Sequence, residues 1–226
     1  MIYFIRHACR ADNGPLQEIK QLFNPSDPHI TESGIFQSFM LGERLSFQIP
    51  DLYSKKFLVV SSPYLRCLQT AESIVNGLKG NYITLVSNQV HIEDALMEQQ
   101  SPQYFSADHF KDLNCFLKKV IYLNTAHNSL EVFNELRQET IGFPERGKNL
   151  YERFLKILQI LENFAKNPSN KDTVLICVGH GFFVSYLYSY FRNETFFDYP
   201  YLSTSKLFYN RETQKIDLEF LDEVLF

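Results

Sequence analysis

Short apolar runs that alternate with helical patterns along the chain are the feature that most limits its fold. Strand-like runs, rich in β-branched and aromatic residues, occupy residues 1–5, 57–62, 82–86 and 173–178. Helical patterns, with apolar residues spaced three or four apart, occupy residues 31–47, 64–78, 150–164 and 182–191. Strands that alternate with helices form a mainly parallel sheet with helices on its faces. We therefore predict a three-layer α/β/α sandwich, followed by a hairpin over residues 206–209 and 216–221.

Local signals predict where two of these helices begin and end. Thr31 can cap the first helix. Ser62 can cap the second, with Pro63 at its first helical position. Either Gly77 or Gly80 can close that second helix.

The chain shows no feature that divides it into independent domains. It contains no internal repeat, low-complexity tract or obvious linker in its 226 residues. The stretch at about 99–148 has weak periodicity, and we interpret it as an insertion that packs over the sheet edge and the site. We therefore expect residues 1–226 to form one domain.

Composition excludes several classes of function. The net charge of −4 and the pI near 5.9 disfavour a nucleic-acid binder, which would need basic patches. No apolar run approaches the ~20 residues that span a bilayer, and the N-terminus lacks the pattern of a signal peptide. The four cysteines form no CxxC pair, so we expect reduced thiols. These features predict a cytoplasmic or nuclear protein, with the cytoplasm preferred, and no membrane or nucleic-acid partner.

Polar residues follow several predicted strands at the point where each strand ends. Arg6 and His7 follow the first strand, with Arg10 one turn later; Arg66 follows the second strand, in the first turn of its helix; His180 follows the fourth strand, between two glycines. Ligands of open α/β sheets bind beyond the carboxyl ends of the strands, so these side chains should converge. Guanidinium groups bind phosphate oxygens in two-pronged fashion. The sequence therefore predicts a phosphate site.

Four ordered segments resemble the histidine phosphatase superfamily, in its phosphoglycerate-mutase-like first branch. They are Arg6-His7-Ala8, residues 61–71, Leu96-Met97-Glu98 and Gly179-His180-Gly181, and residues 28–45 resemble a helix of the family. The resemblance covers most of the chain apart from residues 99–148. Within the superfamily, Arg10 and residues 66–71 and 92–98 look most like the suppressor-of-T-cell-receptor-signalling and ecdysteroid-phosphate phosphatases.

The resemblance implies a metal-independent phosphatase without a cofactor. His7 would attack phosphorus and carry the phosphate, while Arg6, Arg66, His180 and Arg10 would hold the phosphate oxygens. Glu98 would be the general acid and then the general base, a role that suits a carboxyl whose pKa is raised by partial burial beside phosphate. Glu93 or Asp94 are the alternative acids. We interpret His29, His91, His109 and His127 as ordinary histidines, outside any metal site.

Two departures from the family pattern leave other functions open. Ala8 stands where the family usually has glycine, which could strain the turn beside His7, and the residues after Glu98 lack the glycine and tryptophan pattern of many members. The alternatives are a phosphoglycerate mutase-type phosphotransferase and a catalytically weak phosphate-binding scaffold on the same fold. The expected partner is a phosphorylated small molecule or a phosphopeptide. The oligomeric state stays open, with a homodimer as one option.

Overall fold

The computed structural model describes residues 1–16, 27–80, 84–85, 90–103, 105, 125–126, 143–193 and 199–223. Within these residues, eight strands form one sheet in the order β5-β4-β2-β6-β1-β7-β8, and β3 pairs separately with β2. The pairs from β5 to β1 are parallel, whereas β7 and β8 run antiparallel. The strands are β1 (Ile2–Arg6), β2 (Lys56–Ser61), β3 (Thr84–Leu85), β4 (Val90–Ile92), β5 (Thr125–Ala126), β6 (Thr173–Gly179), β7 (Thr204–Asn210) and β8 (Lys215–Glu223).

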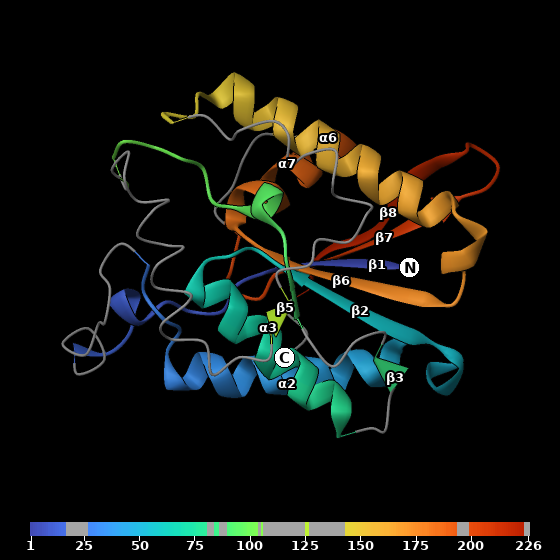
Figure 1. Ribbon diagram of the computed structural model, residues 1–226, viewed down its shortest axis with the longest axis horizontal. Coiled ribbons are helices and arrows are strands. Elements are labelled where there is room, and N and C mark those ends of the chain that lie inside the picture. The colour runs from blue at the N-terminus through green and yellow to red at the C-terminus, as the bar shows by residue number, and fades with distance from the viewer. Residues whose placement is uncertain are drawn as a thin grey trace.

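Helices cover both faces of this sheet, as Figure 1 shows. One face carries α2 (Glu32–Gln48) and α3 (Leu65–Lys79), and the other carries α6 (Gly147–Lys166) and α7 (Gly181–Arg192). Single 3₁₀ turns, including η1 (Ala11–Asn13), η2 (Leu52–Ser54), η3 (Asp94–Leu96) and η5 (Pro168–Asn170), lie in the connections. The predicted three-layer α/β/α sandwich is confirmed.

The two-residue period of β1 explains why the sheet is covered on both sides. Tyr3 and Ile5 point into the core beneath α2 and α3, whereas Ile2 and Phe4 point into the core beneath α6 and α7. All four side chains are buried. Because burying a large apolar side chain contributes about 1.5–3 kcal/mol, both helical layers add to the stability of this central strand.

Helices α2 and α3 approach each other closely through two glycines. A Cβ at Gly77 would lie 2.1 Å from the carbonyl oxygen of Phe39, and a Cβ at Gly42 would lie 2.2 Å from that of Ile74. Neither position has room for a side chain, because the obstacle is backbone in both cases. The close approach explains why residue 77, in the interior of α3, is a glycine. The helix ends at Gly80, its C-cap. Of the two glycines expected to close this helix, Gly80 does so.

The structure agrees with most of the expected elements and adds two strands. Thr31 caps α2, because its hydroxyl accepts the N–H of Gly34 at 2.9 Å. The strand β4 was missed, because its three residues lie in a stretch that looks polar and aperiodic. Only two residues of the strand expected at 82–86 are described, as β3.

Most of the proposed insertion at 99–148 lies outside the described residues. Its two residues in β5 pair with β4 at the edge of the sheet. The assignment of the whole chain to one domain stays a prediction. In the described part of the chain, no helix is both long and apolar enough to cross a membrane.

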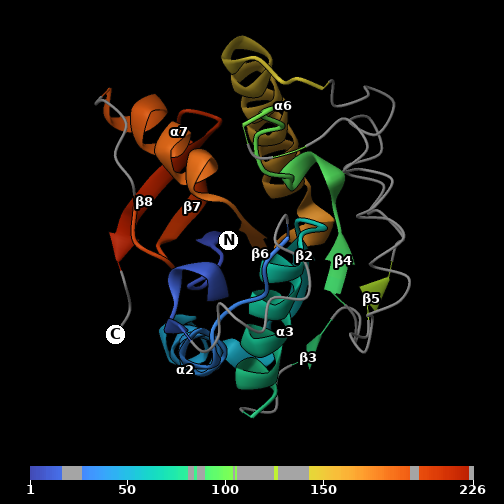
Figure 2. The same ribbon diagram turned by 90° about the vertical axis from the view of Figure 1, so that its left-hand side faces the viewer.

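The four neighbouring parallel strands β4, β2, β6 and β1 have their carboxyl ends on the same side of the molecule, the side that faces the viewer in Figure 2. Arg6 at the end of β1 is in register with Gly179 at the end of β6. Ser61 at the end of β2 is in register with both Val178 of β6 and Ile92 of β4. The residues that follow these ends therefore emerge side by side.

Gly77→Ala tests the close approach of α2 and α3. The added methyl group must push the two backbones apart. We expect the free energy of unfolding to fall by about 1–3 kcal/mol, the usual cost of overpacking. Gly147→Ala is the matched control, because a Cβ there meets nothing within 4 Å. Denaturant unfolding measures both, and equal effects of the two substitutions would contradict the packing account.

Candidate functional site

His7 and His180 come together because β1 and β6 end in register. The N–H of His7 donates to the carbonyl oxygen of Gly179 at 2.9 Å, which continues the pairing by one residue. The two imidazole rings face each other edge to face, with centroids 5.4 Å apart. Both side chains are buried.

A backbone contact fixes the protonation of the His7 ring. Nδ1 of His7 lies 2.8 Å from the carbonyl oxygen of Ala8. Since a carbonyl oxygen can only accept, Nδ1 carries the hydrogen, and the lone pair of the neutral ring is on Nε2. In this form, Nε2 is the ring nitrogen of His7 that can act as a nucleophile.

The surroundings of His7 keep its ring neutral. Burial lowers the pKa of His7 well below its usual value, and the nearby charges of Arg66 and Arg6 act in the same direction. The contact with Ala8 opposes these effects but does not outweigh them. A neutral imidazole near neutral pH is the form that can attack phosphorus.

His180 lies between Ser62 and Glu98. Its Nε2 is 2.8 Å from the hydroxyl of Ser62, and its Nδ1 is 3.2 Å from Oε2 of Glu98. Burial lowers the pKa of His180 to about 4, although Glu98 opposes this effect, so the ring is neutral at pH 7.

Ser62 was expected to cap α3, but its hydroxyl contacts His180 instead. Helix α3 begins at Leu65 with no side-chain cap from its own N-cap residue.

The protein surroundings of Glu98 favour its ionised form, whereas the raised pKa was expected beside a bound phosphate. Burial alone would raise the pKa of Glu98, but His180, Arg66 and the N–H of Gln99 stabilise the carboxylate and hold its pKa well below the usual range. Oε2 of Glu98 is 3.7 Å from Nη2 of Arg66. A bound phosphate would compete for the same donors.

Glu98 is also the acidic residue that the fold brings to the histidines. Of the two alternative acids, Glu93 is buried, and its carboxylate accepts the N–H of Ala95 in η3. Asp94 is exposed. The geometry therefore favours Glu98 over both.

Arg66 is buried, and an acid that the sequence analysis missed holds it in place. Nη1 of Arg66 lies 3.3 Å from Oδ1 of Asp27, and Nη2 lies 3.2 Å from Nδ1 of His180. The guanidinium also lies over the ring of Tyr64, 4.5 Å from its centroid. Asp27 comes from a loop with no helical or strand pattern, so no local signal pointed to it.

Asp27 has a second role at the start of α3. Its two carboxylate oxygens accept the N–H of Leu65 at 3.1 and 3.0 Å, so Asp27 caps a helix from a distant part of the chain. Burial raises the pKa of Asp27 to about 6, although Arg66 and the N–H of Leu65 oppose the shift. One carboxylate thus positions both the helix and its arginine.

Arg6 is held from the opposite side of the site, and a glycine leaves room for it. Its guanidinium donates to the carbonyl oxygen of Tyr199 and lies over the ring of Tyr201, 4.6 Å from the centroid. A Cβ at Gly181 would lie 3.2 Å from Cζ of Arg6. Gly179 is required by packing too, since its Cβ would lie 2.7 Å from the ring of Phe4. Neither glycine has a positive φ, so space rather than a sharp turn explains them.

Arg10 lies at the rim of the site, about one third exposed, and is paired with Asp12. Its Nε donates to Oδ1 of Asp12 at 2.9 Å, and an Nη2 contact to Oδ2 completes a two-pronged pair. Its charge still acts on Glu98 and Asp27. Arg66, Glu98 and His180 are in direct contact with one another, and Arg10 lies beside these three residues without joining their contacts.

Ala8 fits its position without strain. Its N–H donates to the hydroxyl of Thr70 at 3.0 Å, and its φ is not in the left-handed region. The methyl group lies against Gly34, where an added Cβ would come within 3.2 Å of it. The space that Gly34 leaves therefore accommodates the extra methyl group next to His7.

The site suits an anion better than a metal ion. His7, Glu98 and His180 offer atoms within 4.8 Å of one another, a spacing that could hold a cation. However, the permanently charged guanidinium of Arg66 lies 3.2 Å from the His180 ring nitrogen and 3.7 Å from the Glu98 carboxylate. This charge repels a divalent cation and attracts phosphate.

Comparisons with known proteins agree with the motifs. A model of the histidine phosphatase superfamily (branch 1) matches residues 2–113. Ecdysone phosphate phosphatase from Bombix mori, solved with tungstate, shares the fold with a TM-score of 0.65 at 16% identity, over 97% of this chain and 91% of that one. A mutant phosphoserine phosphatase from Entamoeba histolytica, solved with phosphoserine, gives 0.57 at 15% identity, over 98% and 96%. No curated protein matches the sequence.

Asp27→Asn tests the buried carboxylate that holds Arg66. Because folding raises the pKa of Asp27 from 3.8 to about 6, the folded protein binds a proton more readily than the unfolded chain, and the contribution of Asp27 to stability increases as the pH falls through 6. The free energy of unfolding of the wild type should therefore rise by about 2–3 kcal/mol relative to the variant between pH 7 and pH 4. Denaturant unfolding across this range measures the difference, and a constant difference would contradict the assignment.

Proposed function

The chain belongs to the histidine phosphatase superfamily, branch 1, and from this premise we propose that it is a phosphomonoester hydrolase acting through phosphohistidine at His7. The observation that carries the proposal is the state of His7. Its Nδ1 is committed to the carbonyl oxygen of Ala8, which leaves the lone pair of Nε2 for phosphorus. Arg66 and His180 lie beside this ring and can take up the charge of the phosphate.

In the first step, Nε2 of His7 attacks phosphorus as the bond to the leaving oxygen breaks. The positive charge that develops on the ring is stabilised by the hydrogen bond from Nδ1 to Ala8. Arg6, Arg66, His180 and Arg10 stabilise the phosphate oxygens. Glu98 gives its proton to the leaving oxygen, so the product is an alcohol and the carboxylate is restored.

Substrate supplies the conditions under which Glu98 can act as an acid. The carboxylate is ionised without ligand because His180 and Arg66 stabilise its charge. Phosphate oxygens compete for these donors and place negative charge beside the carboxylate, and both effects raise the pKa of Glu98. A monoanionic phosphomonoester can provide the proton itself.

In the second step, Glu98 removes a proton from water, and the oxygen attacks the phosphorus of phosphohistidine. The P–N bond breaks, inorganic phosphate leaves, and His7 regains the lone pair on Nε2. No metal ion or cofactor takes part in either step.

We assign the substrate to phosphorylated small molecules or phosphopeptides, in the cytoplasm. Two similar folds carry names that refer to ecdysone phosphate and phosphoserine, which are an alkyl phosphate on a steroid and one on an amino acid. The wide spacing of the four cysteines, with no CxxC pair, supports this compartment.

His7→Ala tests the nucleophile. We expect hydrolysis of p-nitrophenyl phosphate to fall by several orders of magnitude, on the order of 10³-fold or more, with little change in folding, because the covalent route is lost. His29→Ala is the control histidine and should retain activity. Isomerisation of 3-phosphoglycerate is measured on the same proteins. Substantial residual hydrolysis in His7→Ala, or mutase activity alone in the wild type, would overturn the proposal.

Glu98→Gln tests the general acid through the leaving group. p-Nitrophenolate leaves without protonation, whereas an alkoxide does not, so kcat/KM for an alkyl phosphate should fall by roughly 10²–10⁴-fold and that for p-nitrophenyl phosphate much less. The parameter kcat/KM is the right one, because it reports only the steps up to departure of the alcohol. Equal losses on both substrates would show that Glu98 has another role.

A further inference from the structure

The segment that carries Glu98 is fixed by an arginine on another element. Arg153 lies on α6, and its Nη1 donates to the carbonyl oxygens of Ala95 and Met97, both at 2.7 Å. Its Nη2 lies 3.5 Å from the carbonyl oxygen of Glu98. Three backbone carbonyls around the proposed acid therefore point to one guanidinium.

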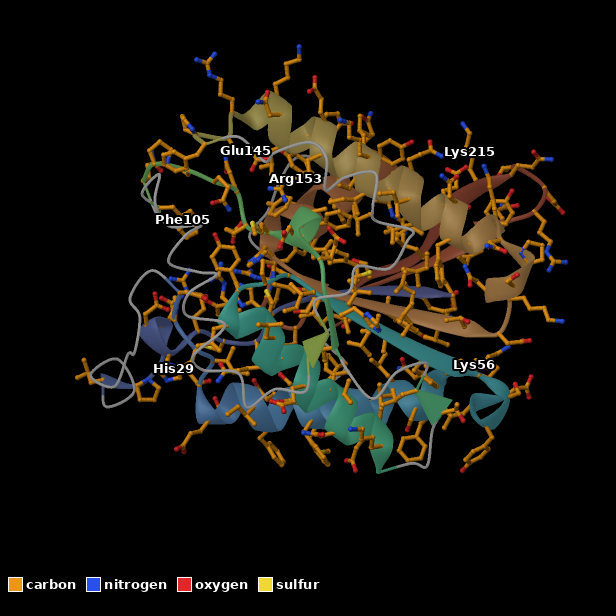
Figure 3. All side chains as sticks on the ribbon, viewed as in Figure 1. His29, Lys56, Phe105, Glu145, Arg153 and Lys215 are labelled. Carbon is orange, nitrogen blue, oxygen red and sulfur yellow. The ribbon has the colours of Figure 1, made fainter. Side chains whose placement is uncertain are left out.

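Glu145 completes this arrangement and links it to the far side of the segment. Nε and Nη2 of Arg153 donate to its two carboxylate oxygens, both at 2.8 Å. The same carboxylate accepts the N–H of Gln100 at 3.2 Å, and the N–H of Glu145 donates to the carbonyl oxygen of Gln100 at 2.8 Å. Figure 3 shows Glu145 and Arg153 side by side near the start of α6. Both side chains are buried.

This geometry requires an arginine. The five N–H groups of Arg153 all have acceptors, on the segment 95–98 or on Glu145. A lysine would bring the same charge with only three donors at one atom, and it could not reach acceptors spread over the width of a guanidinium. The charge of Arg153 is matched by Glu145, whereas Arg66 faces the histidines of the phosphate site.

We propose that Arg153, with Glu145, is the positioning residue that sets the place of Glu98 for proton transfer. The inference rests on the proposed function, in which Glu98 is the general acid and base. After η3 ends at Leu96, residues 97–103 form no helix or strand, so no ladder of backbone hydrogen bonds fixes Glu98. Proton transfer needs the carboxyl within hydrogen-bond reach of the leaving oxygen, and a shift of about 1 Å can cost about 100-fold in rate. Arg153 supplies the missing constraint from α6.

Arg153→Lys separates positioning from a general structural role. We expect kcat/KM for an alkyl phosphate to fall by about 10–100-fold, because Glu98 is displaced, and kcat/KM for p-nitrophenyl phosphate to change by less than about 3-fold. Inorganic phosphate should bind with unchanged affinity in calorimetry, since Arg66 and His180 are untouched. Lys148→Met removes an exposed charge from the same helix and is the matched control, with no change expected.

The double variant Arg153→Lys/Glu98→Gln provides a second readout. If Arg153 acts only through Glu98, Arg153→Lys should cause no further loss once the carboxylate is gone. Equal losses on both substrates, or a further loss in the Glu98→Gln background, would overturn the proposal. If Arg153→Lys does not fold, Glu145→Gln takes its place with the same selective loss expected. If Glu98→Gln lowers kcat/KM equally for both substrates, the assignment of Glu98 as the acid is wrong. If Glu98→Gln shows the selective loss and Arg153→Lys does not, only the role of Arg153 is wrong.

Discussion

The in-register ends of β1, β6, β2 and β4 are the constraint on which the rest of the site depends. Arg6 pairs with Gly179, and Ser61 pairs with Val178 and Ile92, so the four strands stop at one level. The next residues must then emerge together, whatever their chemistry. Parallel strands buried between two helical layers cannot slip by one residue without turning apolar side chains to the wrong face. The packing of the core therefore sets the distance between the two histidines.

The charges at this edge balance through a chain of contacts. Asp27 and Glu98 lie on two sides of Arg66, and Glu98 in turn contacts His180. Burial penalises each charge, and the pairing offsets much of the penalty. Burial, with the charge of Arg66, keeps His7 neutral, and His180 and Arg66 keep Glu98 ionised until, in the proposed mechanism, a phosphate takes over these donors. The proposed mechanism needs a neutral His7 and an acid that can exchange a proton, and Arg66 acts on the pKa of both groups.

The sequence predicted the parts of the site that carry local signals and missed those that depend on distant contacts. His7, Arg66 and His180 follow strands or open a helix, so their convergence could be predicted from the order of elements alone. Asp27 lies 39 positions from Arg66 along the chain, and nothing near it in the sequence indicates the contact. The glycines show the same limit. Gly77 looks like a helix end, but it is needed inside α3 because the backbone of α2 lies against it, and Gly181 leaves room for Arg6, whose Cζ would lie 3.2 Å from a Cβ there. The donors that stabilise the Glu98 carboxylate come from three separate segments, so the sequence did not indicate them.

The central claim concerns which atom of the protein carries the phosphate. The wild type is mixed with a phosphomonoester and the reaction is stopped rapidly at alkaline pH, because phosphohistidine is labile in acid. Mass spectrometry then identifies the phosphorylated residue, and ³¹P NMR identifies the ring nitrogen. Because Nδ1 of His7 donates to Ala8, the account predicts phosphate on Nε2 of His7. Phosphate on Nδ1, on another residue, or no phosphoenzyme during turnover would contradict it.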